Sequence, residues 1–154
     1  MKGIIKIMEK EVMIETRIGV YGVIIRDGKI ALVKKANGGY KGLYDLPGGG
    51  IERGEKPIET LHRELMEEVG VKVISEKILG AVATTIKWDV NDKLVQDLHH
   101  IGILYTVLIE GDTLKTSPDG LDSLGGVWMD IESIRKDIVS PFTWMALQEL
   151  GYKK

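Results

Sequence analysis

Three glutamates, Glu64, Glu67 and Glu68, are the residues whose type and spacing point most directly to chemistry. Successive residues of an α-helix turn by about 100°, so positions i, i+3 and i+4 share one face. Like charges at these spacings repel and weaken the helix. Such a cluster therefore needs open water or a cation, and carboxylate oxygens are ligands that suit Mg²⁺ and Mn²⁺. We predict a divalent metal site on this helix.

The segment around the glutamates predicts how they are positioned. Three consecutive glycines, residues 48–50, predict a turn whose backbone can approach a ligand closely. Pro57 suits the first turn of a helix and Gly70 suits its C-terminal end. Between these two residues, apolar side chains recur at helical spacing: Ile58, Leu61, Leu65, Met66 and Val69. A salt bridge from Arg63 to Glu55 would fix the preceding loop on the helix.

The rest of the chain predicts a mixed sheet. The apolar run 18–25 is typical of a strand buried on both faces, and Asp27-Gly28 predicts a hairpin turn after it. Further strands are predicted at 30–33, 44–46, 71–74, 78–86, 98–109 and 127–129, a polar loop at 89–97, a weak helical turn at 131–134, and a last helix from Ser140-Pro141. Residues 1–11 suit either an edge strand or a loose arm. We predict one α/β domain of the α+β kind over residues 1–154, with helices on both faces of a central mixed β-sheet.

Composition limits the partners and the location. The formal net charge is −2, which argues against a broad nucleic-acid surface but leaves room for a local site that binds a nucleic-acid end. The absence of cysteine excludes disulfides and thiolate metal sites. The N-terminus does not read as a signal peptide, and no apolar run approaches the length of a membrane span. We expect a cytoplasmic protein without a membrane partner, and leave a homodimer open.

Residues 49–71 resemble the Nudix box at every position of its pattern. The pattern consists of Gly49, five residues, Glu55, seven residues, and then Arg63-Glu64-Leu65-x-Glu67-Glu68-x-Gly70-Val71. The hairpin before the box, Leu46-Pro47-Gly48 and a late strand at Trp128 extend the resemblance over most of the chain. The resemblance implies a Nudix-type α/β/α sandwich. It also implies a hydrolase that cleaves a nucleoside diphosphate linked to another group by metal-assisted attack of water on phosphorus.

The resemblance also implies roles for single residues. The three helix glutamates correspond to metal ligands, with Glu64 also a candidate general base, and Gly48 corresponds to a position whose carbonyl often binds a metal. Glu55 and Arg63 correspond to the pair that orients the loop. Members of the family often add a carboxylate from a later loop. Asp122 is our candidate for this further ligand, while Asp97, Glu110 and Asp119 remain alternatives.

Substrate-binding residues are less clearly marked. Lys35 ends a strand that commonly supplies a basic residue to the phosphates, although a solvated strand end is the simpler interpretation. Trp88 and Tyr44 are candidates to stack on a base, with Tyr40 and Trp128 as weaker ones, and packing is the alternative for each. His99 and His100 point to opposite faces of a strand, so they do not form one metal site, but one of them can line a pocket.

The expected reaction is Mg²⁺- or Mn²⁺-dependent pyrophosphohydrolysis of a nucleoside triphosphate. This expectation rests on a length and plain architecture that resemble the MutT-like group. The proline typical of ADP-ribose-cleaving relatives is missing from 83–86, and the asparagine that reads oxidised guanine is missing near Val139-Ser140. Pyrophosphohydrolysis at RNA 5′ ends and a non-catalytic nucleotide sensor are the two alternatives.

Overall fold

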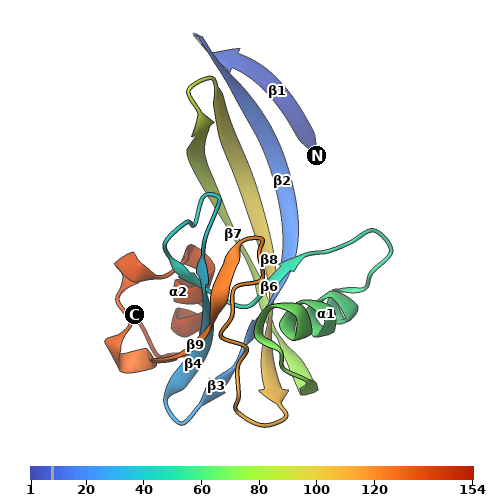
Figure 1. Ribbon diagram of the computed structural model, residues 1–154, viewed down its shortest axis with the longest axis vertical. Helices are drawn as coiled ribbons and strands as arrows, with labels where there is room; N and C mark the ends of the chain where they lie inside the picture. The colour runs from blue at the N-terminus through green and yellow to red at the C-terminus, as the bar shows by residue number, and fades with distance from the viewer. Residues whose placement is uncertain (8) are drawn as a thin grey trace.

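The computed structural model describes residues 1–7 and 9–154, which form two sheets with a helix on either side (Figure 1). The larger sheet contains β1 (Lys2–Ile7), β2 (Lys10–Val23), β8 (Leu94–Ile109) and β7 (Val73–Asn91) in that order, with β6 (Gly48–Gly50) paired to β2. The smaller sheet contains β3 (Ile25–Arg26), β4 (Lys29–Lys35), β5 (Tyr44–Asp45) and β9 (Ser123–Asp130). The helices are α1 (Pro57–Val69) and α2 (Pro141–Glu149), and the 3₁₀ turns are η1 (Ile131–Ser133) and η2 (Lys136–Ile138). β2 and β8 are parallel while the other strand pairs are antiparallel, which confirms the predicted mixed sheet.

Strands β2 and β4 separate two hydrophobic clusters, because successive side chains of a strand point to opposite faces. Val20 belongs to the cluster under α1, where it joins Leu65, and Tyr21 belongs to the cluster under α2, where it joins Phe142. All four side chains are 5% exposed or less. The two helices therefore cover opposite faces, as predicted.

Both helices begin where the sequence predicted. The backbone N–H of Lys56 donates to the Glu59 carboxylate over 2.8 Å just before Pro57, and Gly70 ends α1 in the left-handed conformation at φ 67°. In α2, the Ser140 hydroxyl accepts from the backbone N–H of Thr143 over 3.2 Å. These local contacts satisfy backbone groups that a helix end would otherwise leave unpaired.

The predicted polar loop at 89–97 is wrong. β7 extends to Asn91 and β8 begins at Leu94, so the segment forms the tip of a long hairpin. The strand predicted at 78–86 and the second half of the one predicted at 71–74 are likewise parts of the single strand β7, which begins at Val73 and has register shifts rather than a break. Cross-strand pairing satisfies the backbone even where few apolar side chains mark the strand, and an ion pair of 3.5 Å from Lys87 to Asp97 crosses the hairpin.

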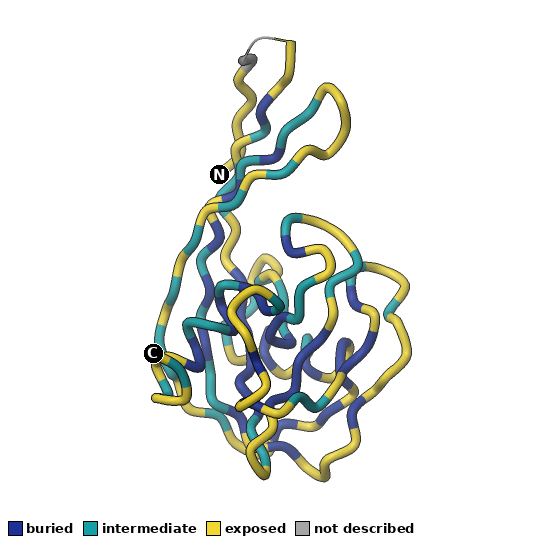
Figure 2. The backbone as a smooth tube through the Cα atoms, turned by 90° about the vertical axis from the view of Figure 1, so that its left-hand side faces the viewer, coloured by how far each residue is buried: buried dark blue, intermediate teal, exposed yellow. Residues whose placement is uncertain are grey.

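The hairpin belongs to an arm that projects from the body (Figures 1 and 2). The arm consists of β1, the first part of β2, and the β7–β8 hairpin, and it carries most of its residues in exposed or half-buried positions (Figure 2). Of the two interpretations of residues 1–11, the edge strand is observed: β1 lies at the edge of the larger sheet, and Lys10 and Glu11 begin β2, while Met8 lies outside the described residues. None of the described helices is long and apolar enough to cross a bilayer.

Candidate active site

The carboxylates of α1 line one cleft. Glu64, Glu67 and Glu68 face it together with Gly48 of β6 and Asp122, which precedes β9, and its volume is about 580 Å³. The structure therefore brings together the three helix glutamates, Gly48 and Asp122, the residues that the sequence analysis put first as metal ligands. Among the alternatives to Asp122, Asp119 also lines the cleft, whereas Asp97 pairs with Lys87 on the arm and Glu110 lies 4.0 Å from Lys72.

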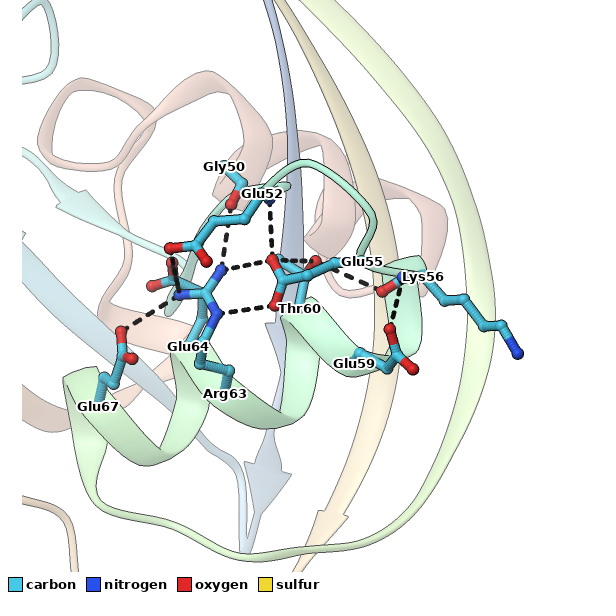
Figure 3. Close-up of polar contacts among 9 residues, drawn as sticks. All are labelled: Gly50, Glu52, Glu55, Lys56, Glu59, Thr60, Arg63, Glu64 and Glu67. Atoms are coloured by element: carbon cyan, nitrogen blue, oxygen red, sulfur yellow. Dashed lines mark hydrogen bonds and ion pairs between the residues drawn. The ribbon is translucent and has the colours of Figure 1, made fainter.

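Arg63 is the centre of the polar contacts at this cleft (Figure 3). Its guanidinium binds the Glu55 carboxylate through two hydrogen bonds of 2.8 Å, from Nε and Nη2, as predicted. Its Nη1 donates to Glu64 over 2.8 Å and to Glu67 over 3.3 Å. The hydrogen bonds from Arg63 lower the pKa of Glu55 to about 2, so this carboxylate stays charged. Arg63 thus ties the loop to α1 and offsets part of the repulsion between the helix glutamates.

The glycines form the short strand β6 and not the turn predicted from their flexibility, because β2 provides the pairing that glycine by itself does not favour. At two of these positions only glycine fits, because a Cβ atom would collide with a neighbouring residue. Gly48 has φ 149°, and a Cβ on it would lie 2.1 Å from the Val20 carbonyl oxygen. A Cβ on Gly49 would lie 2.6 Å from the carboxyl carbon of Glu64. The Gly48 N–H donates to Glu68 over 3.0 Å, so backbone and carboxylates are in direct contact.

Burial makes these carboxylates costly to ionise without a cation. Glu68 is 5% exposed, and its burial raises its pKa to about 8; burial also raises the pKa of Glu64 despite its bond to Arg63. The donor set of hard oxygens fits Mg²⁺ or Mn²⁺ chemically. Within residues 1–7 and 9–154, however, no three acidic or histidine side chains have the arrangement of a metal site. Arg63 and the Gly48 amide hold the glutamates, so metal binding would require them to turn.

A second cavity of about 200 Å³ adjoins the cleft and shares Gly48–Gly50 and Asp122 with it. Lys35 lines this cavity and donates to Asp122 over 2.5 Å. Burial, the largest single effect, lowers the pKa of Lys35, but the hydrogen bond to Asp122 and the nearby charges of Asp45, Asp122 and Glu68 together outweigh it, so the pKa is raised. The predicted phosphate-binding lysine and the predicted loop carboxylate therefore meet at the boundary between cavity and cleft.

Sequence reasoning missed four polar residues of this cavity, namely Arg17, Tyr21, Asn37 and Asp45, whereas His100 is the one of the two histidines that lines a pocket. Arg17 and His100 are neighbours because β2 and β8 pair in parallel across some eighty residues of chain, which no local pattern reveals. The sequence signal was that consecutive side chains of a strand point to opposite faces, so that one of His99 and His100 can face a pocket. His99 is exposed and His100 is buried, which confirms that they face opposite sides.

Tyr44 and Trp88 line neither cavity. The Tyr44 ring lies 5.6 Å from the ammonium of Lys34 and packs against the hydrophobic cluster under α2. Trp88 packs against the backbone of Gly39, where a Cβ would meet its ring at 2.8 Å. Their roles in substrate binding stay predictions, and the geometry of Trp88 favours support of the 36–43 loop.

Buried His100 makes stability depend on pH. Burial, followed by the nearby charges of Arg17 and Lys35, lowers its pKa from 6.5 to about 4, so the unfolded chain takes up the proton first. The stabilisation is complete above pH 6.5 and is lost as pH falls toward 4. We expect the free energy of unfolding to drop between pH 7 and 4.5 by roughly 2–3 kcal/mol more in the wild type than in His100→Gln.

Urea unfolding at the two pH values measures this difference. The matched control is His99→Gln, an exposed neighbour on the other face, which should keep the pH dependence of the wild type. Equal pH dependence in the wild type and His100→Gln would contradict the assignment.

Comparison with known proteins places this site in a family. The fold is that of MutT-type hydrolases: a MutT NUDIX hydrolase from Burkholderia pseudomallei superposes with a TM-score of 0.71 at 24% identity, over 88% of this chain and 98% of that one. The chain is 32% identical over 127 residues to an ADP-ribose pyrophosphatase of Methanocaldococcus jannaschii, covering 78% of this chain and 71% of the relative. It is 29% identical over 124 residues to an RNA pyrophosphohydrolase of Bartonella clarridgeiae, covering 73% and 70%.

The model of the NUDIX domain matches residues 15–150, and the chain belongs to the NUDIX family. It is accordingly a hydrolase that acts on pyrophosphate bonds. The matched region contains the carboxylate cleft, the adjoining cavity and both helices, so the resemblance seen in the 23 residues of the box extends over the whole body.

Proposed function

We propose that the chain hydrolyses, with Mg²⁺ or Mn²⁺, a phosphoanhydride bond in a small molecule built on a nucleoside diphosphate. The single observation that carries the proposal is that the carboxylate cleft and the smaller cavity adjoin. The carboxylate cleft suits a metal with phosphates, and through Gly48–Gly50 and Asp122 it opens onto a smaller cavity that suits the rest of the substrate.

Each residue then has a definite part. Glu64, Glu67, Glu68, Asp122 and the Gly48 carbonyl would hold the metal, which supplies a polarised phosphoryl oxygen and a more acidic water when it is bound. Glu64 would accept the proton of the attacking water. Arg63 and Glu55 keep β6 and its loop on α1. Lys35 would donate to a phosphate oxygen at the boundary of the cavity.

A nucleoside triphosphate, cleaved to a monophosphate and pyrophosphate, is the first substrate that we propose. ADP-ribose is the second, favoured by the similarity to the Methanocaldococcus jannaschii ADP-ribose pyrophosphatase. The Bartonella clarridgeiae relative favours RNA 5′ ends. A cavity of about 200 Å³ and a net charge of −2 favour small molecules over RNA.

The test is hydrolysis of a substrate panel with the products identified. Nucleoside triphosphates, ADP-ribose and RNA with a 5′-triphosphate are incubated with Mg²⁺ or Mn²⁺, and the products show which phosphorus is attacked. We expect EDTA to reduce the rate to background and added Mg²⁺ to restore it, because the bound metal would polarise the phosphoryl oxygen and make the attacking water acidic enough to give its proton to Glu64. Turnover that is insensitive to EDTA would contradict the proposal, and binding without any turnover would favour the sensor.

A further inference from the structure

A histidine held between two tyrosines lies at the wall of the smaller cavity. The Tyr21 hydroxyl is 2.8 Å from Nε2 of His100, and the Tyr40 hydroxyl is 2.9 Å from its Nδ1. All three side chains line the cavity and are at most 7% exposed. The chain of contacts therefore joins β2, β8 and the 36–43 loop, and none of the catalytic roles described above uses it.

The hydrogen bonds of this chain cannot all be satisfied by the three residues. His100 is neutral near pH 7, because burial lowers its pKa to about 4, and a neutral imidazole has one N–H donor and one lone-pair acceptor. Only one tyrosine can donate to it. The other tyrosine accepts the imidazole N–H, and its own O–H proton must be directed elsewhere.

That proton has no acceptor in the described part of the chain. Neither hydroxyl makes a second hydrogen bond to residues 1–7 or 9–154, whichever tautomer His100 adopts. Both hydroxyls belong to residues that line the cavity, so a molecule bound there can supply the missing acceptor. A buried donor left without a partner is costly, which favours a ligand or water that accepts from it.

The charges of the cavity indicate what kind of acceptor this is. Arg17 and Lys35 contribute two positive side chains, and Asp45 and Asp122 contribute two negative ones, so the formal charges balance. Ile86 and Leu98 contribute apolar side chains to the cavity lining. This lining has no net charge that would select an anion, and in the proposed function the phosphates lie in the carboxylate cleft and at its boundary, where Lys35 contacts them. An uncharged acceptor on the nucleoside or sugar part of the substrate fits best.

The surroundings hold the donor in place. Phe142 of α2 packs against the His100 ring at 4.5 Å between centroids, in the space left by Gly102. The Trp88 ring packs against the backbone of Gly39, the residue that precedes Tyr40. Since rigid supports keep a hydrogen-bond donor at its productive position, the donor is preorganised.

From this geometry we infer that the hydrogen-bonded side chains of Tyr21, His100 and Tyr40 determine substrate specificity. They present one O–H donor to an uncharged acceptor of the substrate. The tyrosine with the unused O–H contacts the substrate, and His100 is a positioning residue that acts through it. The inference rests on the proposed function, since it names the part of the substrate that this cavity recognises.

Equilibrium binding tests the inference independently of turnover. The probe is α,β-methylene-ADP, which is not hydrolysed between its phosphates, titrated into the full chain with Mg²⁺ and followed by calorimetry. The decisive variant is Tyr21→Phe/His100→Leu/Tyr40→Phe, because replacing all partners by apolar groups leaves no buried polar group unpaired. Tyr105→Phe is the control, since this half-buried tyrosine lies outside the cavity and makes no hydrogen bond through its hydroxyl to the described residues.

We expect the triple variant to bind about three- to tenfold more weakly, as loss of one net hydrogen bond predicts, and Tyr105→Phe to bind as the wild type does. Circular dichroism confirms folding. A folded triple variant with wild-type affinity would overturn the inference, as would a wild type that does not bind the probe. If the triple variant fails to fold, wild-type affinity in both single phenylalanine variants overturns it. Failure of the wild type to hydrolyse any substrate counts against the proposed function alone.

Discussion

Replacement of Glu68 by glutamine is expected to lower turnover by more than about a hundredfold while leaving the fold intact. Loss of even an outer-shell partner of a metal costs roughly 10- to 100-fold, and a direct ligand should cost more. Glutamine has nearly the same shape and still offers an oxygen to the Gly48 N–H. Because burial raises the pKa of Glu68 to about 8, its side chain is mostly neutral at pH 7 without a metal, and the neutral glutamine should leave the free energy of unfolding of the metal-free protein nearly unchanged.

Steady-state rates at saturating substrate and Mg²⁺ measure the effect on turnover, and thermal unfolding of the metal-free proteins measures the effect on stability. Glu64→Gln should behave similarly in turnover. Glu132→Gln is the matched control, because Glu132 is exposed in η1 and its side chain makes no hydrogen bond or ion pair with the described residues. Activity near that of the wild type in both Glu64→Gln and Glu68→Gln would refute the site assignment.

Replacement of Gly48 by alanine is expected to destabilise the fold by about 2–5 kcal/mol and to abolish most activity. The backbone of Gly48 has φ 149°, which side chains rarely tolerate, and a Cβ would lie 2.1 Å from the Val20 carbonyl oxygen. Strained backbone and overpacking each cost roughly 1–3 kcal/mol. Relief requires β6 to move away from β2, which takes the Gly48 backbone away from Glu68.

Gly50→Ala in the same strand is the matched control for stability. Gly50 has ordinary backbone angles, and no atom lies within 4 Å of a Cβ placed on it. Urea unfolding should therefore show a loss for Gly48→Ala that Gly50→Ala does not share. A similar stability for the two variants would mean that Gly48 is not held against Val20 in solution.

Prediction from sequence was reliable where the causes are local. Helix α1 was predicted from Pro57, Gly70 and an apolar stripe, and the pairing of Arg63 with Glu55 was predicted from their spacing. Prediction failed at the 89–97 segment, because its strand character depends on pairing across the hairpin and not on apolar periodicity. The glycine strand β6 was missed for the same reason.

The sequence alone predicted the class of chemistry, because the glycines, Glu55 and Arg63 stand at fixed spacing from Glu64, Glu67 and Glu68, which helical geometry places on one face. Only the tertiary structure decided what lies beside that helix. It brings His100 between Tyr21 and Tyr40, although these residues come from three segments far apart in the chain. The physical reason is that helical geometry depends on neighbours in sequence, whereas the cavity depends on the register with which β2 and β8 pair.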